Sequence, residues 1–168
     1  MPIPIQGADP AQNELLAGLE AKTKRPNAFF RVMAQRPEVL KGFVPLYGAI
    51  MGAGAVERRI KELVYLTCSY ANRCAYCTAA HTAGAGKAGI TEAELRALES
   101  GEDKPFSAAE RAAIAYARDL TLVATAAESR EALFAHFTHE QIVEITLVAA
   151  MANFTNRFNN GLHILPEA

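Results

Sequence analysis

Four residues able to do redox or acid–base chemistry stand close together near the middle of the sequence: Glu62, Cys74, Cys77 and His81. The cysteines form a C-x-x-C pair, and His81 follows Cys77 by four residues. Because residues four apart share one face of a helix, the imidazole of His81 can exchange a proton with the thiol of Cys77. Cys74 can bridge to Cys77 without unfolding such a helix. The spacing therefore predicts a thiol pair with a base beside it.

The position of the two cysteines relative to the predicted helices favours their ionised form. The apolar run around residues 60–67 predicts a helix that ends near Asn72, and a second helix begins at about Cys74. Both thiols then lie in the first helical turn, where free N–H groups and the helix dipole stabilise a thiolate. The thiolate is the form that attacks peroxides and disulfides, so this placement predicts reactive cysteines.

Glu62 lies on the apolar face of the preceding helix. A carboxylate is costly to bury there without a partner, which favours a functional role for it. We expect Glu62 to orient His81, directly or through a water molecule. It would then be the third member of a set made of nucleophile, base and orienting group.

The stretch Asn72-Arg-Cys-Ala-Tyr-Cys-Thr-Ala-Ala-His81, with Glu62 before it, resembles the alkyl hydroperoxidase D-like proteins of the carboxymuconolactone decarboxylase superfamily. The resemblance covers about residues 57–89. It implies a helical fold that assembles as a homo-trimer or homo-hexamer, and a peroxidase cycle. In that cycle a hydroperoxide oxidises Cys77 to a sulfenic acid, and Cys74 condenses with it to a disulfide. Glu62 and His81 match the proton-relay residues of the family.

Two supporting residues, Asn72 and Tyr76, belong to the same motif. The better-studied peroxidases of the family carry a histidine between the cysteines, where this sequence has Tyr76. Its hydroxyl can donate a hydrogen bond, but an ordinary pKa of about 10 makes it a poorer proton shuttle near neutral pH. The resemblance also implies an external dithiol as reductant, such as a lipoyl-bearing protein. We expect no bound cofactor and no metal.

Three alternatives to a peroxidase stay open from the residues alone. Cys74, Cys77 and His81 could bind zinc with Glu62 or His163 as a fourth ligand, although structural zinc sites usually take their ligands from two separated pairs. The chain could be an oligomeric binding module with idle thiols. It could also be a decarboxylase acting on a small lactone, but such enzymes of the superfamily do not depend on a cysteine pair.

The elements that must position these residues are predicted to be helices. Nearly every segment between Asp9 and Asn160 has helical periodicity, so we predict an all-α, compact domain of about seven to nine helices. Helix starts are expected at Asp9-Pro10, Asn27, Thr91, Ser107 and Thr138, the last three with a capping-box pattern. Helix ends are expected at Gly52 and Gly54, within residues 84–89, and at the loop 101–105.

A faint internal repeat appears when the sequence is shifted by 82 positions. Residues 60–63 then align with 142–145, Glu62 with Glu144, and His81 with His163. Cys74 and Cys77 align with Asn156 and Asn159. If the repeat reflects the fold, the chain contains two related helical hairpins, and the second serves as a packing partner for the first.

The bulk properties exclude several classes of protein. The 168 residues fit a single domain, 1–168. A net charge of −1 gives no indication of nucleic-acid binding. The longest apolar stretch, 142–154, is too short for a membrane span and the N-terminus lacks signal-peptide features, so we expect a cytoplasmic protein. An odd cysteine count argues against a disulfide framework, and Cys68 is expected in the core.

Overall fold

The computed structural model describes residues 5–167, and this range consists of helices and loops with no strand. The helices are η1 (Pro10–Gln12, a 3-10 turn), α1 (Glu14–Thr23), α2 (Ala28–Met33), α3 (Pro37–Met51), α4 (Arg58–Ala71), α5 (Ala75–Lys87), α6 (Glu92–Ser100), α7 (Ala108–Val123), α8 (Ala127–Leu133) and α9 (His139–Gly161). The predicted all-α class is confirmed. Nine α-helices within the described residues is the upper end of the predicted number.

Helix starts follow the capping signals closely. The side chains of Thr91, Ser107 and Thr138 each cap a helix, and the reciprocal capping box is formed in all three. Asn27 caps α2 as predicted, accepting a hydrogen bond from the Phe30 amide at 2.9 Å. The start predicted at Asp9 opens only the short η1. The backbone is extended at Asn13, which follows η1, and the side chain of Asn13 caps α1.

The predicted helix ends agree with the structure. Gly52 follows the last residue of α3, and Gly101 ends α6 in the left-handed conformation, with φ of 80°. Within the segment 84–89, α5 continues through Gly84 and ends at Lys87, as predicted. Gly84 serves close packing, because a Cβ atom there would lie 2.7 Å from Oε1 of Glu62. A glycine at this position therefore lets α5 lie directly against the buried carboxylate of α4.

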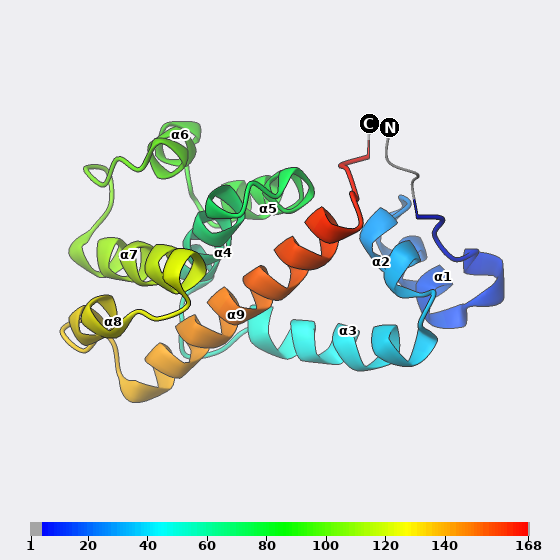
Figure 1. Ribbon diagram of the computed structural model, residues 1–168, viewed down its shortest axis with the longest axis horizontal. Helices are drawn as coiled ribbons and strands as arrows, with labels where there is room; N and C mark the ends of the chain where they lie inside the picture. The colour runs from blue at the N-terminus through cyan, green and yellow to red at the C-terminus, as the bar shows by residue number, and fades with distance from the viewer. Residues whose placement is uncertain (1–4, 168) are drawn as a thin grey trace.

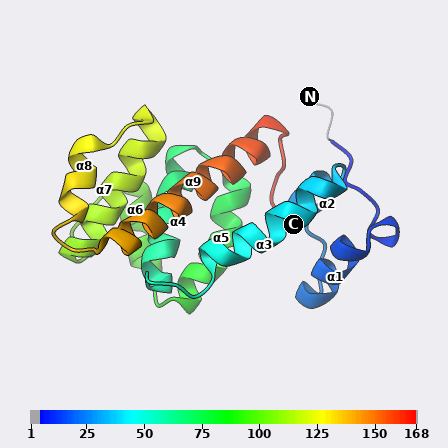
Figure 2. The same ribbon diagram turned by 90° about the horizontal axis from the view of Figure 1, so that it is seen from below.

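Helix α4 is at the centre of the molecule and packs against α5, α7 and α9. The long helix α9 runs diagonally across the fold, with α4, α5 and α7 on one side and α3 on the other (Figure 1). Figure 2 shows α3 alongside α9, with α1 and α2 set beyond them at one end of the molecule. The main hydrophobic core joins these helices, and a smaller cluster lies between α4, α5, α6 and α7. This frame brings α3, α4, α5 and α9 together.

The second half of the internal repeat does not form a hairpin. Helix α9 passes without a break through Asn156 and Asn159, the positions that correspond to Cys74 and Cys77. The first hairpin turns at Arg73, which adopts a φ of 52°, whereas residues 139–160 contain neither glycine nor proline to stop the helix. The hairpin expectation is therefore wrong. The role of packing partner is right, because α9 lies against α4 and α5.

The apolar stretch 142–154 lies within α9 and contributes buried residues to the core. Among the described residues, no helix has the length and apolar character needed to cross a membrane.

Candidate active site

The site begins at the corner between α4 and α5. Asn72 ends α4, and Arg73 reverses the chain in the left-handed region of backbone space. Cys74 then caps α5, with its amide donating to the carbonyl of Ser69 at 2.9 Å. The predicted helix break at Asn72 and helix start at Cys74 are thus confirmed to within one residue. Both cysteines lie at the positive end of the α5 dipole.

Cys74 and Cys77 form a disulfide across the first turn of α5, with Cα atoms 5.4 Å apart. The amide of Cys77 also donates to Sγ of Cys74 at 3.3 Å. Both side chains are buried, at 1% and 2% exposure. The pair is therefore within bonding reach while the helix stays intact, as the three-residue spacing predicted.

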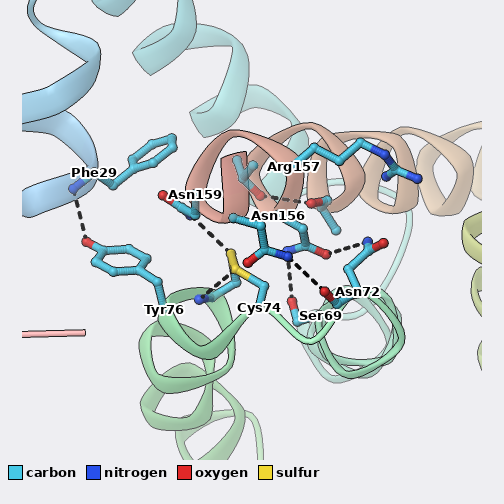
Figure 3. Close-up of a disulfide and its surroundings, with 12 residues drawn as sticks. Phe29, Ser69, Asn72, Cys74, Tyr76, Asn156, Arg157 and Asn159 are labelled. Atoms are coloured by element: carbon cyan, nitrogen blue, oxygen red, sulfur yellow. Dashed lines mark hydrogen bonds between the residues drawn. A yellow bond between two sulfur atoms is a disulfide. The ribbon is translucent and has the colours of Figure 1, made fainter. Parts of the chain in front are cut away.

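Helix α9 supplies a polar contact to this sulfur pair. Nδ2 of Asn159 donates to Sγ of Cys77 at 3.1 Å, and Figure 3 shows the amide group directed at the disulfide. Oδ1 of Asn159 is buried and has no hydrogen-bond partner among the described residues. An amide donor at this position would stabilise a thiolate on Cys77 once the disulfide is reduced.

A line of hydrogen bonds runs from α4 through α5 to α3. Nδ1 of His81 lies 2.8 Å from Oε2 of Glu62, and Nε2 of His81 lies 3.1 Å from the hydroxyl of Tyr47. The ring of Tyr65 stacks on the imidazole, with centroids 3.6 Å apart. A guanidinium nitrogen of Arg58 lies 2.5 Å from the other oxygen of Glu62. Glu62 thus orients His81 directly, as predicted, and the ring is held on three sides.

The ionisation of these groups follows from their partners. Burial raises the pKa of Glu62, but the hydrogen bond from His81 and the charges of His81 and Arg58 outweigh it, so the pKa lies below its ordinary value. Burial, with the nearby charge of Glu62, raises the pKa of Tyr47. Glu62 is therefore an anion at neutral pH, and Tyr47 keeps its proton.

A cavity of about 220 Å³ lies against these groups. Its polar lining includes Cys77, His81 and Asn159, whereas Cys74 and Glu62 are not among the residues that line it. The rest of the lining is mostly aromatic and comes from α2, α3, α4 and α5: Phe29, Phe30, Phe43, Tyr47, Tyr65 and Tyr76. One residue of the cysteine pair therefore borders an apolar space large enough for a small organic molecule.

The two supporting residues of the motif have different surroundings. Asn72 donates to Oδ1 of Asn153 and of Asn156 and so ties the α4–α5 corner to α9 (Figure 3). Tyr76 lines the cavity, and its hydroxyl donates to Oδ1 of Asn27 at 3.2 Å. Burial raises the pKa of Tyr76 to about 12, which disfavours it further as a proton shuttle at neutral pH.

Sequence reasoning missed Tyr47 and Arg58, and it noted Asn159 only as the counterpart of Cys77 in the shifted alignment. That alignment was a usable signal for Asn159, since the two residues are in contact. Cys68 lies in the core, as predicted. Cys68 is fully buried, where burial raises the pKa of its thiol to about 11. His136, His139 and His163 are exposed.

The geometry does not form a metal cage. Among residues 5–167, no group of three or more His, Cys, Asp or Glu side chains is arranged to hold a metal ion. His163, the suggested fourth ligand, lies exposed at the end of α9.

Taken together, the fold and the site define an all-helical protein with a cysteine pair at a helix N-terminus and a Glu–His pair beside it. Residues 37–119 match the Carboxymuconolactone decarboxylase family. This range contains the motif region 57–89, on which the resemblance was based. Over these residues the chain is similar to the carboxymuconolactone decarboxylase family, and its fold is that of the alkyl hydroperoxidase D-like structures.

Individual relatives support the same fold. The uncharacterized protein YdfG of Bacillus subtilis is 29% identical over 109 residues, covering 62% of this chain and 74% of YdfG. A peroxidase-related protein of Ralstonia eutropha JMP134, described as an alkylhydroperoxidase AhpD core, has a TM-score of 0.85 at 22% identity over 99% of this chain and 94% of its own. The debrominase Bmp8 has a TM-score of 0.84 at 20% identity over 98% and 92%. The fold therefore serves more than one activity.

Proposed function

We propose that the protein is a thiol-dependent peroxidase that reduces organic hydroperoxides through a Cys74–Cys77 dithiol–disulfide cycle. The observation that carries the proposal is the position of Cys77. Cys77 borders an aromatic cavity of about 220 Å³ that His81 also lines, while Cys74 does not line the cavity and is within disulfide reach.

The two cysteines have separate roles in this cycle. The Cys77 thiolate attacks the terminal oxygen of R–O–O–H, so that the O–O bond breaks and a sulfenic acid and an alcohol are formed. The Cys74 thiol then displaces water from the sulfenic acid and closes the disulfide. Cys77 lines the cavity, which supports it as the attacking residue, and Cys74 does not, which supports it as the residue that resolves the intermediate.

Glu62 and His81 supply the acid–base chemistry. A carboxylate held as an anion beside Nδ1 stabilises the imidazolium form of His81, which forms when the ring takes the thiol proton. In this structure both ring nitrogens have partners, Glu62 and Tyr47, so His81 acts on Cys77 through an intervening group.

The cycle needs an external dithiol to reopen the disulfide, and a lipoyl-bearing protein is one such reductant. A reducing compartment such as the cytoplasm suits this requirement. We also propose a homo-trimer or homo-hexamer. An apolar stripe along α3 and α9 stays exposed in the single chain and is a suitable subunit contact; it consists of Val39, Leu46, Val143, Leu147 and Phe154.

The test is a count of free thiols on the reduced protein before and after one equivalent of cumene hydroperoxide, with mass mapping of the bridge. Loss of two thiols and a Cys74–Cys77 link support the proposal. Cys77→Ser should abolish hydroperoxide consumption, and Cys74→Ser should leave a sulfenic acid that dimedone traps at Cys77. Three unchanged thiols in the wild type would refute the peroxidase function.

A thiol-dependent dehalogenase is the second candidate. It is favoured by the fold shared with Bmp8, which in a cysteine-to-alanine variant is known in complex with 2,3,4-tribromopyrrole, and by the aromatic lining of the cavity. Release of bromide from 2,3,4-tribromopyrrole by the reduced protein, without any reaction with cumene hydroperoxide, would favour this candidate over the peroxidase.

A further inference from the structure

The relay of the proposed reaction has a gap between His81 and the reacting atoms. Nδ1 of His81 bonds to Glu62, and Nε2 bonds to a hydroxyl rather than to Cys77. A proton that moves between the imidazole and the cavity must therefore pass through the group on Nε2, or that group must move away. The identity of this group decides which residue meets the substrate.

Three tyrosines line the cavity, and their hydroxyls have different partners. The hydroxyl of Tyr65 lies 2.5 Å from Oγ1 of Thr155, and the hydroxyl of Tyr76 donates to Oδ1 of Asn27. Among the described residues, only the hydroxyl of Tyr47 bonds to the imidazole of His81. Tyr47 is half-buried on α3, so it borders both the imidazole and the space that a substrate would fill.

We infer that Tyr47 is a catalytic residue that passes the proton between His81 and the reacting atoms. This inference rests on the proposed peroxidase function and adds a residue from outside the cysteine motif. The better-studied peroxidases of the family carry a histidine between the two cysteines, where this chain has Tyr76. Tyr47 of α3 would supply the acid in place of that histidine.

The Cys77 thiol gives its proton to the oxygen of Tyr47 while Tyr47 passes its own proton to Nε2 of His81, which leaves a thiolate and an imidazolium paired with Glu62. The thiolate attacks the terminal peroxide oxygen, the S–O bond forms, and the O–O bond breaks. The leaving alkoxide takes the Tyr47 proton, and Tyr47 recovers one from Nε2. The net reaction converts a thiol and R–O–O–H into a sulfenic acid and R–OH.

Tyrosinate does not accumulate in this sequence, because each proton that Tyr47 gives is replaced from its other side. Burial and the charge of Glu62, which raise the pKa of Tyr47, therefore do not oppose its role as a relay. They keep the phenol protonated at rest and ready to serve as the acid for the alkoxide.

The leaving group provides the sharpest test. An alkoxide must be protonated as it departs, whereas the carboxylate that leaves a peracid is stable without a proton. We would measure the oxidation of reduced Cys77 by cumene hydroperoxide and by 3-chloroperbenzoic acid, two aromatic oxidants of similar size. Because both react with the same thiolate, the ratio of the two rates cancels any change in the thiolate fraction.

Tyr47→Phe removes only the hydroxyl. We expect it to slow the reaction with cumene hydroperoxide by about 100-fold relative to its effect on the peracid, the scale of general acid catalysis. Tyr76→Phe is the matched variant. It can change both rates by reshaping the cavity, but it should leave their ratio unaltered.

An equal loss with both oxidants, or no loss with either, would overturn the role of Tyr47 as an acid. A wild type that reacts with neither oxidant would refute the proposed function, and the inference would fall with it. If Tyr47→Phe does not fold, 3-fluorotyrosine at position 47 keeps the ring and the hydroxyl but makes the phenol more acidic. A rate ratio that changes with this analogue would support the inference, and an unchanged ratio would overturn it.

Discussion

Two glutamates on neighbouring helices, Glu62 of α4 and Glu144 of α9, occupy corresponding positions in the shifted sequence but have different partners. Glu62 bonds to the imidazole of His81, beside the cavity. Glu144 pairs with the ammonium group of Lys61 and accepts the amides of Ala55 and Val56 at 2.7 and 3.0 Å. Both carboxylates have a pKa below the ordinary value, because favourable partners outweigh the cost of burial.

The difference shows that the partner of a carboxylate, and not its burial, decides whether the carboxylate stabilises the fold or takes part in a reaction. Lys61 is a fixed charge and amide groups do not titrate, so Glu144 can only hold the loop between α3 and α4 in place. The imidazole of His81 can accept or donate a proton, and it borders the cavity. A carboxylate coupled to such a ring can influence the movement of a proton.

The largest effect that the comparison predicts is on stability. Glu144→Gln leaves the ammonium group of Lys61, which is 1% exposed, without its counter-charge. Breaking a buried ion pair from one side costs about 3–5 kcal/mol, and this corresponds to a fall in Tm of roughly 10 °C at this chain length. Thermal unfolding of the purified variant measures the loss.

Glu102→Gln is the control, since Glu102 lies on an exposed loop. Its Tm should equal that of the wild type. The double variant Lys61→Met with Glu144→Gln removes both charges and should recover part of the lost stability. A Glu144→Gln protein as stable as the wild type would mean that the ion pair is not a structural device.

The second prediction concerns activity. In Glu62→Gln the amide oxygen still accepts the Nδ1 proton of His81, but it no longer stabilises the imidazolium by charge. We expect the reaction of Cys77 with cumene hydroperoxide to slow by about 100-fold, with a smaller loss of stability than in Glu144→Gln. Stopped-flow measurement of thiol loss at neutral pH checks the rate, and Glu144→Gln, below its Tm, should keep the wild-type rate. Equal rates for the two variants would remove Glu62 from the relay.

Local signals made most of the fold predictable. The capping residues Thr91, Ser107 and Thr138 act within their own first turn, so their neighbours in the sequence are sufficient to identify them. The disulfide pair and the Glu62–His81 contact also involve elements adjacent in the chain. The hairpin wrongly expected in α9 came from an alignment alone, without the glycine or proline that would stop the helix.

The rest of the site depends on contacts between distant parts of the chain. Tyr47 and His81 are 34 residues apart, and Asn159 and Cys77 are 82 apart. Tyr47 and Asn159 lie on helices whose periodic pattern shows that one face is buried but not which helix will cover it. Only the packing of α3 and α9 around α4 and α5 brings Tyr47 to His81 and Asn159 to Cys77.

A third prediction tests whether α9 contributes to the site beyond packing. Asn159→Leu keeps a side chain of similar volume but removes the amide donor to Sγ of Cys77. One hydrogen bond to a charged group contributes about 1.5–3 kcal/mol, so the thiolate fraction at neutral pH should fall by about tenfold or more. Absorbance of the thiolate at 240 nm during a pH titration measures this fraction. An unchanged titration would limit Asn159 to a packing role.

The smallest predicted effect is the response of the Glu144 ion pair to acid. Because the pKa of Glu144 in the folded protein lies below its ordinary value of 4.5, the unfolded chain binds protons more readily as the pH falls. The stability that the ionised group contributes is therefore complete above this pH and is lost as the pH falls through the folded-state value. The Tm difference between the wild type and Glu144→Gln should be constant above about pH 5 and should shrink by roughly 2–4 °C toward pH 3. A difference that stays constant over the whole range would show that Glu144 stabilises the fold through its shape and hydrogen bonds, and not through its charge.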